Sequence, residues 1–196
     1  MLDDSVYLTL LAAAEIPVDL EPLASRIRAS SNFCFEWQWY RRAPRRPPSG
    51  EEAMRLLAAV CRDGELHGFL HRSRDPDDEA SFEIELPHAH SRFLPAEGEL
   101  EKVLARAAAD HLGAYSRFLE DAAPAQVQEV RDLFLAAGSY RPFELNRGAI
   151  PGCRECRQWG SHLFSSWFYG VAWDWCFCVL WEESDLVWLG CLTDTD

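Results

Sequence analysis

The pattern of hydrophobic and polar positions is clearest near the C-terminus. Residues 163–181 contain a single charged residue, Asp174. From residue 175 to residue 181, every position is apolar. Because both alternating sets are apolar, we predict a central β-strand that is covered on both faces. One face would carry Trp173, Trp175, Phe177, Val179 and Trp181, and the other Cys176, Cys178 and Leu180.

The residues after this run predict a β-hairpin. "EESD" (182–185) has turn composition, and "LVWLGCL" (186–192) is typical of a returning strand. A four-residue turn would place Trp181 opposite Leu186, and therefore Cys176 opposite Cys191. Cys178 would then share one face of the sheet with these two cysteines.

Helical spacing of apolar residues recurs elsewhere in the chain. The strongest example is residues 98–119, where apolar positions keep a 3.6-residue period. Ser49 and Glu52 form a capping-box pattern ahead of another such segment, while Pro124 and Gly138 bound a third. We predict helices at residues 4–15, 19–29, 49–62, 98–119 and 124–137.

Two further extended regions are predicted. "FCFEWQWY" (33–40) alternates aromatic residues with mostly smaller or polar ones, as a strand does. Residues 65–72 and 80–86 would form a hairpin with a long acidic tip, in the manner of a winged-helix wing. The Arg/Pro-rich residues 41–48 and the Pro/Gly-rich residues 139–161 are predicted to be loops.

These elements predict an α+β fold. Its N-terminal part would be helical, and the aromatic C-terminal hairpin would supply the core strands of an antiparallel sheet. A chain of 196 residues is expected to be one domain, residues 1–196, with a possible division into subdomains 1–95 and 96–196.

Charge and composition narrow the class of protein. A net charge of −13 repels phosphate backbones, so we expect no nucleic-acid partner, and it attracts basic proteins. Asp174 stands near the middle of the longest apolar run and argues against a membrane span. Asp3 and Asp4 do not suit a signal peptide, and seven cysteines are an odd number, so we expect reduced thiols in the cytoplasm.

One motif resembles a metal site. Cys153 and Cys156 have C-x-x-C spacing, and His162 follows six residues later, which is a pattern that can bind zinc. Further ligands would have to come from Cys176, Cys178 or Cys191. The alternative is that these cysteines are loop thiols and core packing.

Motifs of common enzymes are absent from the sequence, including G-x-S-x-G, Walker A and H-E-x-x-H. An unfamiliar catalytic site would have to use Asp174, His162 and the arginine loop Arg41–Arg46. That loop could also bind a phosphate, or could simply be a solvated loop.

A small, acidic, Trp-rich chain without a catalytic motif resembles the bacterial immunity proteins of toxin–immunity pairs. The resemblance implies a non-enzymatic cytosolic protein that captures and neutralises a basic partner, with no cofactor. Two acidic clusters are the candidate partner surfaces: Asp75, Asp77, Asp78 and Glu79, and Glu182, Glu183 and Asp185. The alternatives are a zinc-stabilised domain built on the 153–162 loop, and an enzyme.

Overall fold

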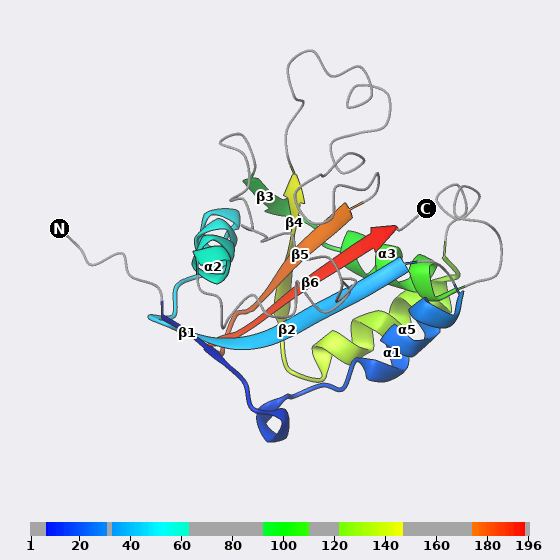
Figure 1. Cartoon of the computed structure of the whole chain (residues 1–196), viewed down its shortest axis with the longest axis horizontal. Coiled ribbons are helices and arrows are strands. Elements are labelled where there is room, and N and C mark those ends of the chain that lie inside the picture. Colours follow the sequence, from blue (N-terminus) through cyan, green and yellow to red (C-terminus); the bar gives the residue numbers. More distant parts are fainter. Residues whose placement is uncertain (1–6, 31–32, 63–91, 110–121, 147–173, 195–196) are drawn as a thin grey trace, which may run out of the picture.

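The computed structural model describes residues 7–30, 33–62, 92–109, 122–146 and 174–194. They form one antiparallel sheet in the order β1-β2-β6-β5-β4-β3, with helices on both faces (Figure 1). The predicted α+β class is therefore confirmed. The strands are β1 (Tyr7–Leu10), β2 (Phe33–Ala43), β3 (Arg92–Pro95), β4 (Tyr140–Asn146), β5 (Asp174–Trp181) and β6 (Leu186–Asp194). The helices are the 3-10 turn η1 (Ala13–Glu15), α1 (Glu21–Ser30), α2 (Gly50–Arg62), α3 (Glu99–Ala108) and α5 (Pro124–Leu135).

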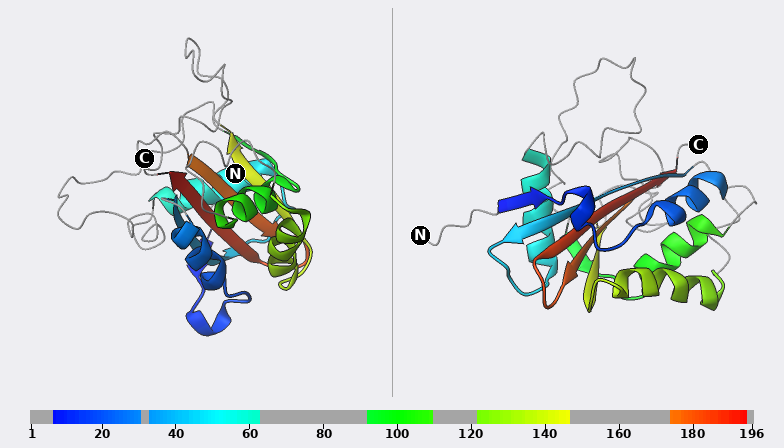
Figure 2. Two further views of the ribbon diagram at one scale, coloured as in Figure 1. Left: turned by 90° about the vertical axis from the view of Figure 1, so that its right-hand side faces the viewer. Right: turned by 90° about the horizontal axis from the view of Figure 1, so that it is seen from below.

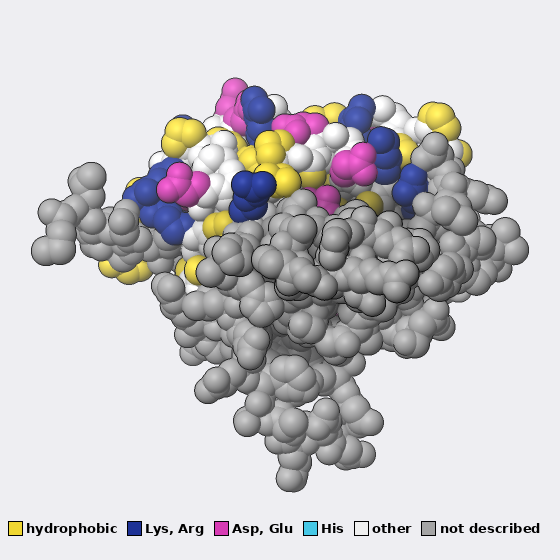
Figure 3. Space-filling model, turned by 90° about the horizontal axis from the view of Figure 1, so that it is seen from above, with side chains coloured by type: hydrophobic (Ala, Val, Ile, Leu, Met, Phe, Trp, Pro, Cys, Tyr) yellow, Lys and Arg dark blue, Asp and Glu magenta, His cyan; other side chains and the backbone are white. Residues whose placement is uncertain are grey.

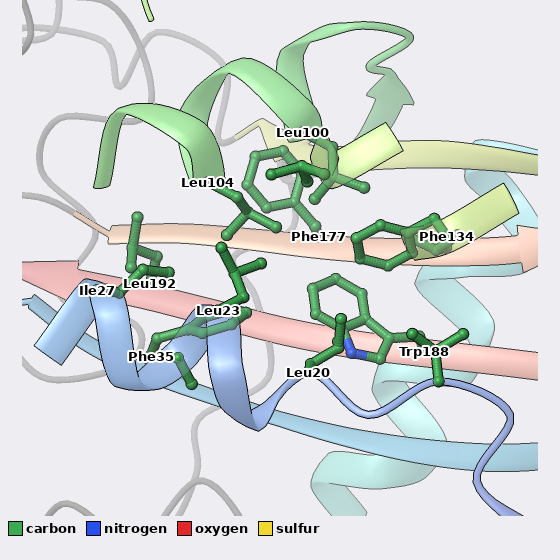
Figure 4. Packing of buried hydrophobic residues seen from close by; sticks show 14 of the residues in the cluster. Leu20, Leu23, Ile27, Phe35, Leu100, Leu104, Phe134, Phe177, Trp188 and Leu192 are labelled. Carbon is green, nitrogen blue, oxygen red and sulfur yellow. The ribbon is translucent and has the colours of Figure 1, made fainter. Parts of the chain in front are cut away.

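Different helices cover the two faces of the sheet. Helices α1, α3 and α5 lie together on one face, and α2 lies on the other (Figures 1 and 2). The core under α1, α3 and α5 is rich in aromatic residues, and Leu23 of α1 and Leu104 of α3 point into it (Figure 4). The core under α2 is built from smaller side chains, including three cysteines. The middle strands are thus buried and apolar on both sides.

The C-terminal hairpin is the centre of the sheet, as predicted. Strand β5 pairs with β6 so that Cys176 lies opposite Cys191, and both share the α2 side with Cys178. On the other side, Trp175, Phe177, Val179 and Trp181 face the aromatic core. The four-residue turn fixes this register, which is the predicted one. A shift of one residue would move every side chain of a strand to the opposite face of the sheet, so the apolar pattern supports the same register.

The aromatic core is tightly interlocked around Trp188 of β6. The ring of Phe134 meets it edge-on at 5.1 Å between centroids, and Phe35 lies 6.2 Å away. The ring of Trp188 also extends over Gly190, two residues along the same strand. A glycine is required at position 190 because the indole occupies the space that a side chain would fill.

The prediction of a helix at residues 4–15 is wrong. Tyr7–Leu10 forms strand β1 on the edge of the sheet, and only Ala13–Glu15 is helical, as a single 3-10 turn. The segment is rich in residues that suit strands, and β2 offers it an unpaired edge. Backbone pairing with β2 therefore outweighs a weak local preference for helix.

Two predicted loops contain strand residues. Strand β2 continues through Arg41 and Arg42 to Ala43, because these residues pair with β1 on one side while Arg41 also pairs with β6 on the other. Residues 140–146 form β4, although this segment contains Pro142. The carbonyl of Pro142 accepts a hydrogen bond from Ala96 just past the end of β3, so its missing N–H faces that edge and interrupts no bond with β5.

The other helix predictions hold within the described residues. Helices α1, α2 and α5 occupy the predicted segments, and Gly138 has a positive φ of 111° after α5. The backbone N–H of Glu52 donates to Ser49 Oγ at 3.1 Å, which is half of the predicted capping box. Helix α3 is confirmed from Glu99 to Ala108, while residues 110–121 and the predicted 65–86 hairpin lie outside the described residues.

Candidate functional site

The predicted site residues fall into two groups. The acidic tip Asp75, Asp77, Asp78 and Glu79 and the metal-site residues Cys153, Cys156 and His162 lie outside the described residues. Glu182, Glu183 and Asp185 lie in the turn between β5 and β6, where the structure defines their surroundings.

Acids of the β5–β6 turn are already paired with arginines. Glu182 forms an ion pair with Arg141 at 2.7 Å, and Asp185 forms one with Arg41 at 3.1 Å. Arg45 donates to the backbone carbonyl of Glu183 at 2.7 Å. Figure 3 shows a similar mixture of basic and acidic side chains on the described part of one face. The turn is therefore a less strongly negative surface than its sequence indicates.

Arg42, in the segment Arg41–Arg46, has a structural role. Arg42 is buried and forms an ion pair with Glu52 of α2 at 3.3 Å, and it also donates to the backbone carbonyl of Trp181 at 3.4 Å. Burial lowers the pKa of Arg42, an effect that the neighbouring Glu52 carboxylate opposes. This ion pair fixes α2 to the end of the sheet. The Glu52 side chain, which the capping-box pattern predicted to bond to the backbone of Ser49, binds Arg42.

The backbone register separates two members of the hypothetical catalytic site. Asp174 pairs with Thr193, and Thr193 pairs with Cys34 of β2. Arg41 is seven residues further along β2, which corresponds to about 23 Å in an extended strand. Asp174 and Arg41 thus lie at opposite ends of the sheet, and His162 is outside the described residues.

Three cysteines lie in the dry core beneath α2. Cys176, Cys178 and Cys191 are all buried. Burial raises the pKa of the Cys178 thiol, and its neighbour Cys176 raises it further, so the metal-binding thiolate form is disfavoured. No group of His, Cys, Asp and Glu within the described ranges has an arrangement that could hold a metal ion.

Two carboxyl groups that are wholly or partly buried were not predicted from the sequence. Glu101 of α3 accepts a hydrogen bond from the Tyr140 hydroxyl at 2.5 Å, and Arg131 of α5 lies 3.7 Å from the same oxygen. Burial raises the pKa of Glu144 in β4 to about 7, with a smaller contribution from Glu99. The Glu101 cluster joins α3, α5 and β4, so we interpret it as structural.

A groove of about 660 Å³ runs beside β2. Its walls are residues of the 11–21 segment, which leaves the sheet, passes through η1 and returns as α1 (Figure 2). Arg28 and four consecutive residues of β2, Glu36 to Trp39, complete the lining. The volume is typical of ligand-binding sites.

The lining of the groove combines apolar and acidic side chains. Ile16 is 37% exposed, and Trp37 is half-buried. Asp19, Glu21 and Glu36 provide three carboxylates, and Arg28 is ion-paired with Glu21. The groove therefore has an apolar surface for contact and an excess of negative charge.

The sequence gives only a weak signal for this groove. Its two walls, residues 11–21 and 36–39, are joined in space by the fold and have no common motif. The one indication is that Glu36 and Gln38 interrupt an aromatic strand, which leaves polar groups next to large apolar side chains.

No helix in the described part of the chain is long and apolar enough to cross a membrane. No protein-family model, curated protein or solved structure matches the chain.

Proposed function

We propose that this chain is a non-enzymatic, acidic cytoplasmic binding protein that captures and neutralises another, basic protein, as bacterial immunity proteins do. The observation that carries the proposal is the groove beside β2, in which exposed apolar surface is combined with three carboxylates. Aromatic and aliphatic side chains at such a site provide affinity, while charges steer the encounter. The net charge of −13 on the whole chain also attracts a basic partner.

The groove is a better candidate surface than the β5–β6 turn. To bind another protein, Glu182 and Asp185 would have to break their ion pairs with Arg141 and Arg41 and form new ones with basic residues of that protein. Asp19 lines a concave surface beside Trp37, where a partner side chain can be enclosed. The acidic tip Asp75, Asp77, Asp78 and Glu79 remains part of the proposal on the basis of its sequence.

The proposal is tested first by identifying the partner. Full-length tagged protein would be produced in its own host and purified at low and high salt. A single basic protein is expected to co-purify in stoichiometric amount, and less of it at high salt because the charges are screened. Expression of that protein alone is expected to arrest growth, and co-expression of the wild-type chain to restore it.

Charge variants then connect the activity to the groove. Asp19→Asn with Glu36→Gln removes two carboxylates from the groove, and the side-chain amide introduced at position 19 can still accept the hydrogen bond from the Glu21 backbone. The matched control is Glu97→Gln with Glu99→Gln, which removes two exposed carboxylates beside β3 at the opposite edge of the sheet.

We expect the groove variant to associate with the partner about tenfold more slowly at low salt than the control, and to restore growth less well. Equal association rates for the two variants would contradict the groove as the binding surface. A co-purifying protein without any effect on growth would contradict neutralisation.

A further inference from the structure

Among the described residues, strand β2 is covered on its outer edge over only part of its length. Strand β1 pairs with Tyr40–Ala43, and the Leu11 N–H donates one more hydrogen bond to the Trp39 carbonyl at 3.1 Å. The chain then turns away into η1 and α1 (Figure 2). From Phe33 to Gln38, the only described strand that pairs with β2 is β6, on the inner edge.

The direction of the backbone groups follows from these hydrogen bonds. The carbonyl of Trp39 points to the outer edge, toward Leu11, whereas the N–H of Arg42 points to the inner edge, toward Asp185. Residues of a strand alternate between its two edges in hydrogen bonding. Phe35 and Trp37 therefore direct both their N–H and their C=O groups outward, and Trp37 lines the groove.

An unpaired strand edge is a template for an incoming strand, and proteins normally block such edges unless they use them. The part of the β2 edge that no described strand covers overlaps, at Glu36 to Gln38, the wall of the groove that the sheet provides. An extended segment placed there would continue the line of β1, and its backbone would pair with Phe35 and Trp37.

We propose that the partner inserts an extended segment into the groove, where it pairs with Phe35 and Trp37 of β2 as an added β-strand. This inference rests on the proposed function and specifies the segment that is recognised. Alternate side chains of an added strand would face the two sides of the sheet. On the α1 side they would meet Trp37 and Ile16, and on the other side Glu36. The segment is therefore one in which apolar residues alternate with Arg or Lys.

The experiment uses the full chain labelled with ¹⁵N and synthetic peptides as probes. The first peptide alternates valine and arginine over about eight residues, enough to span the open edge. A second has the same sequence with N-methyl groups on alternate backbone nitrogens, so it has the same charge but lacks half of its donors. A third replaces every arginine with glutamate.

Amide hydrogen exchange then reports the mode of binding. In the free protein, the Phe35 and Trp37 amides are expected to exchange faster than those of Glu36 and Gln38, which face β6. The valine–arginine peptide is expected to protect Phe35 and Trp37 and to leave Glu36 and Gln38 unchanged. We expect the N-methylated peptide to bind about tenfold more weakly, because it loses backbone hydrogen bonds.

The outcomes separate the two proposals. Equal binding of the N-methylated peptide, protection elsewhere, or no binding of the valine–arginine peptide would overturn strand addition. In each case, restoration of growth by the wild-type chain and poorer restoration by the groove variant would still support the proposed function. Equal binding of the glutamate peptide would overturn the preference for a basic segment. Strand addition without any growth phenotype would instead overturn neutralisation.

Discussion

Gly190 is the position at which the smallest change should have the largest effect on the core. A Cβ atom at this position would lie 2.1 Å from Cη2 and 2.3 Å from Cζ2 of Trp188. Ordinary contact begins near 3.4 Å, so the indole in Gly190→Ala would have to move by more than 1 Å. Trp188 is fully buried, and Phe134 and Phe35 hold its ring, so little space is open to it.

Overpacking of this kind costs about 1–3 kcal/mol in well-packed cores. The expected loss is at the upper end, about 3 kcal/mol, because the contact is with a rigid ring rather than with the end of a flexible chain. With a urea dependence of about 2 kcal/mol per molar, this loss corresponds to a midpoint shift of about 1.5 M.

Urea unfolding followed by tryptophan fluorescence and far-UV circular dichroism measures this shift. The control is the same substitution in a Trp188→Leu background, where the ring that causes the clash is absent. There, Gly190→Ala is expected to cost less than about 1 kcal/mol, and the difference gives the coupling between the two positions. Unfolding of Gly190→Ala at the wild-type urea concentration, or an equal cost in both backgrounds, would refute a clash between Trp188 and a side chain at position 190.

The buried charges and thiols give further expectations. Glu52→Gln leaves the buried Arg42 guanidinium without a carboxylate and is expected to cost about 3–5 kcal/mol in urea unfolding, whereas a cost below about 1 kcal/mol would contradict a buried pair. The pKa of Glu144 rises from 4.5 in the unfolded chain to about 7 in the fold, so its contribution to stability is present below pH 4.5 and is lost as the pH rises through 7. Urea midpoints should therefore show Glu144→Gln to be more stable than wild type at about pH 8 but not at about pH 4.5, and equal differences at both pH values would contradict this. The three described cysteines should resist iodoacetamide until the protein unfolds, and rapid labelling of Cys178 in the native state would contradict its burial.

The C-terminal hairpin could be predicted from the sequence because its determinants are local. Its strands are continuously apolar, and a four-residue turn fixes which residues face each other. Strands β1 and β4 could not be predicted in the same way. Tyr7–Leu10 is a short edge strand that is stabilised by its pairing with β2. In β4, Pro142 is tolerated because its missing N–H faces the end of β3, and this cannot be known until the neighbouring strands are known.

Charged residues were harder to interpret than apolar ones. "RRAPRR" is consistent with an exposed anion-binding loop, but Arg42 is buried against Glu52, and Arg41 is paired with Asp185 beside the neighbouring strand β6. These partners lie far away in the chain, so no local pattern shows them. For the same reason no local pattern predicts the groove, since its walls come from two separate segments.

The most direct test of the account is site-specific photo-crosslinking in the host cell. A photoreactive phenylalanine would replace Ile16, which is 37% exposed and lines the groove, or Leu135 of α5, which is 46% exposed and lies elsewhere. We expect the probe at position 16 to capture one basic protein and the probe at position 135 not to capture it. Capture of the same protein only from position 135 would contradict the groove as the binding surface, and capture of nothing from either position would contradict a protein partner.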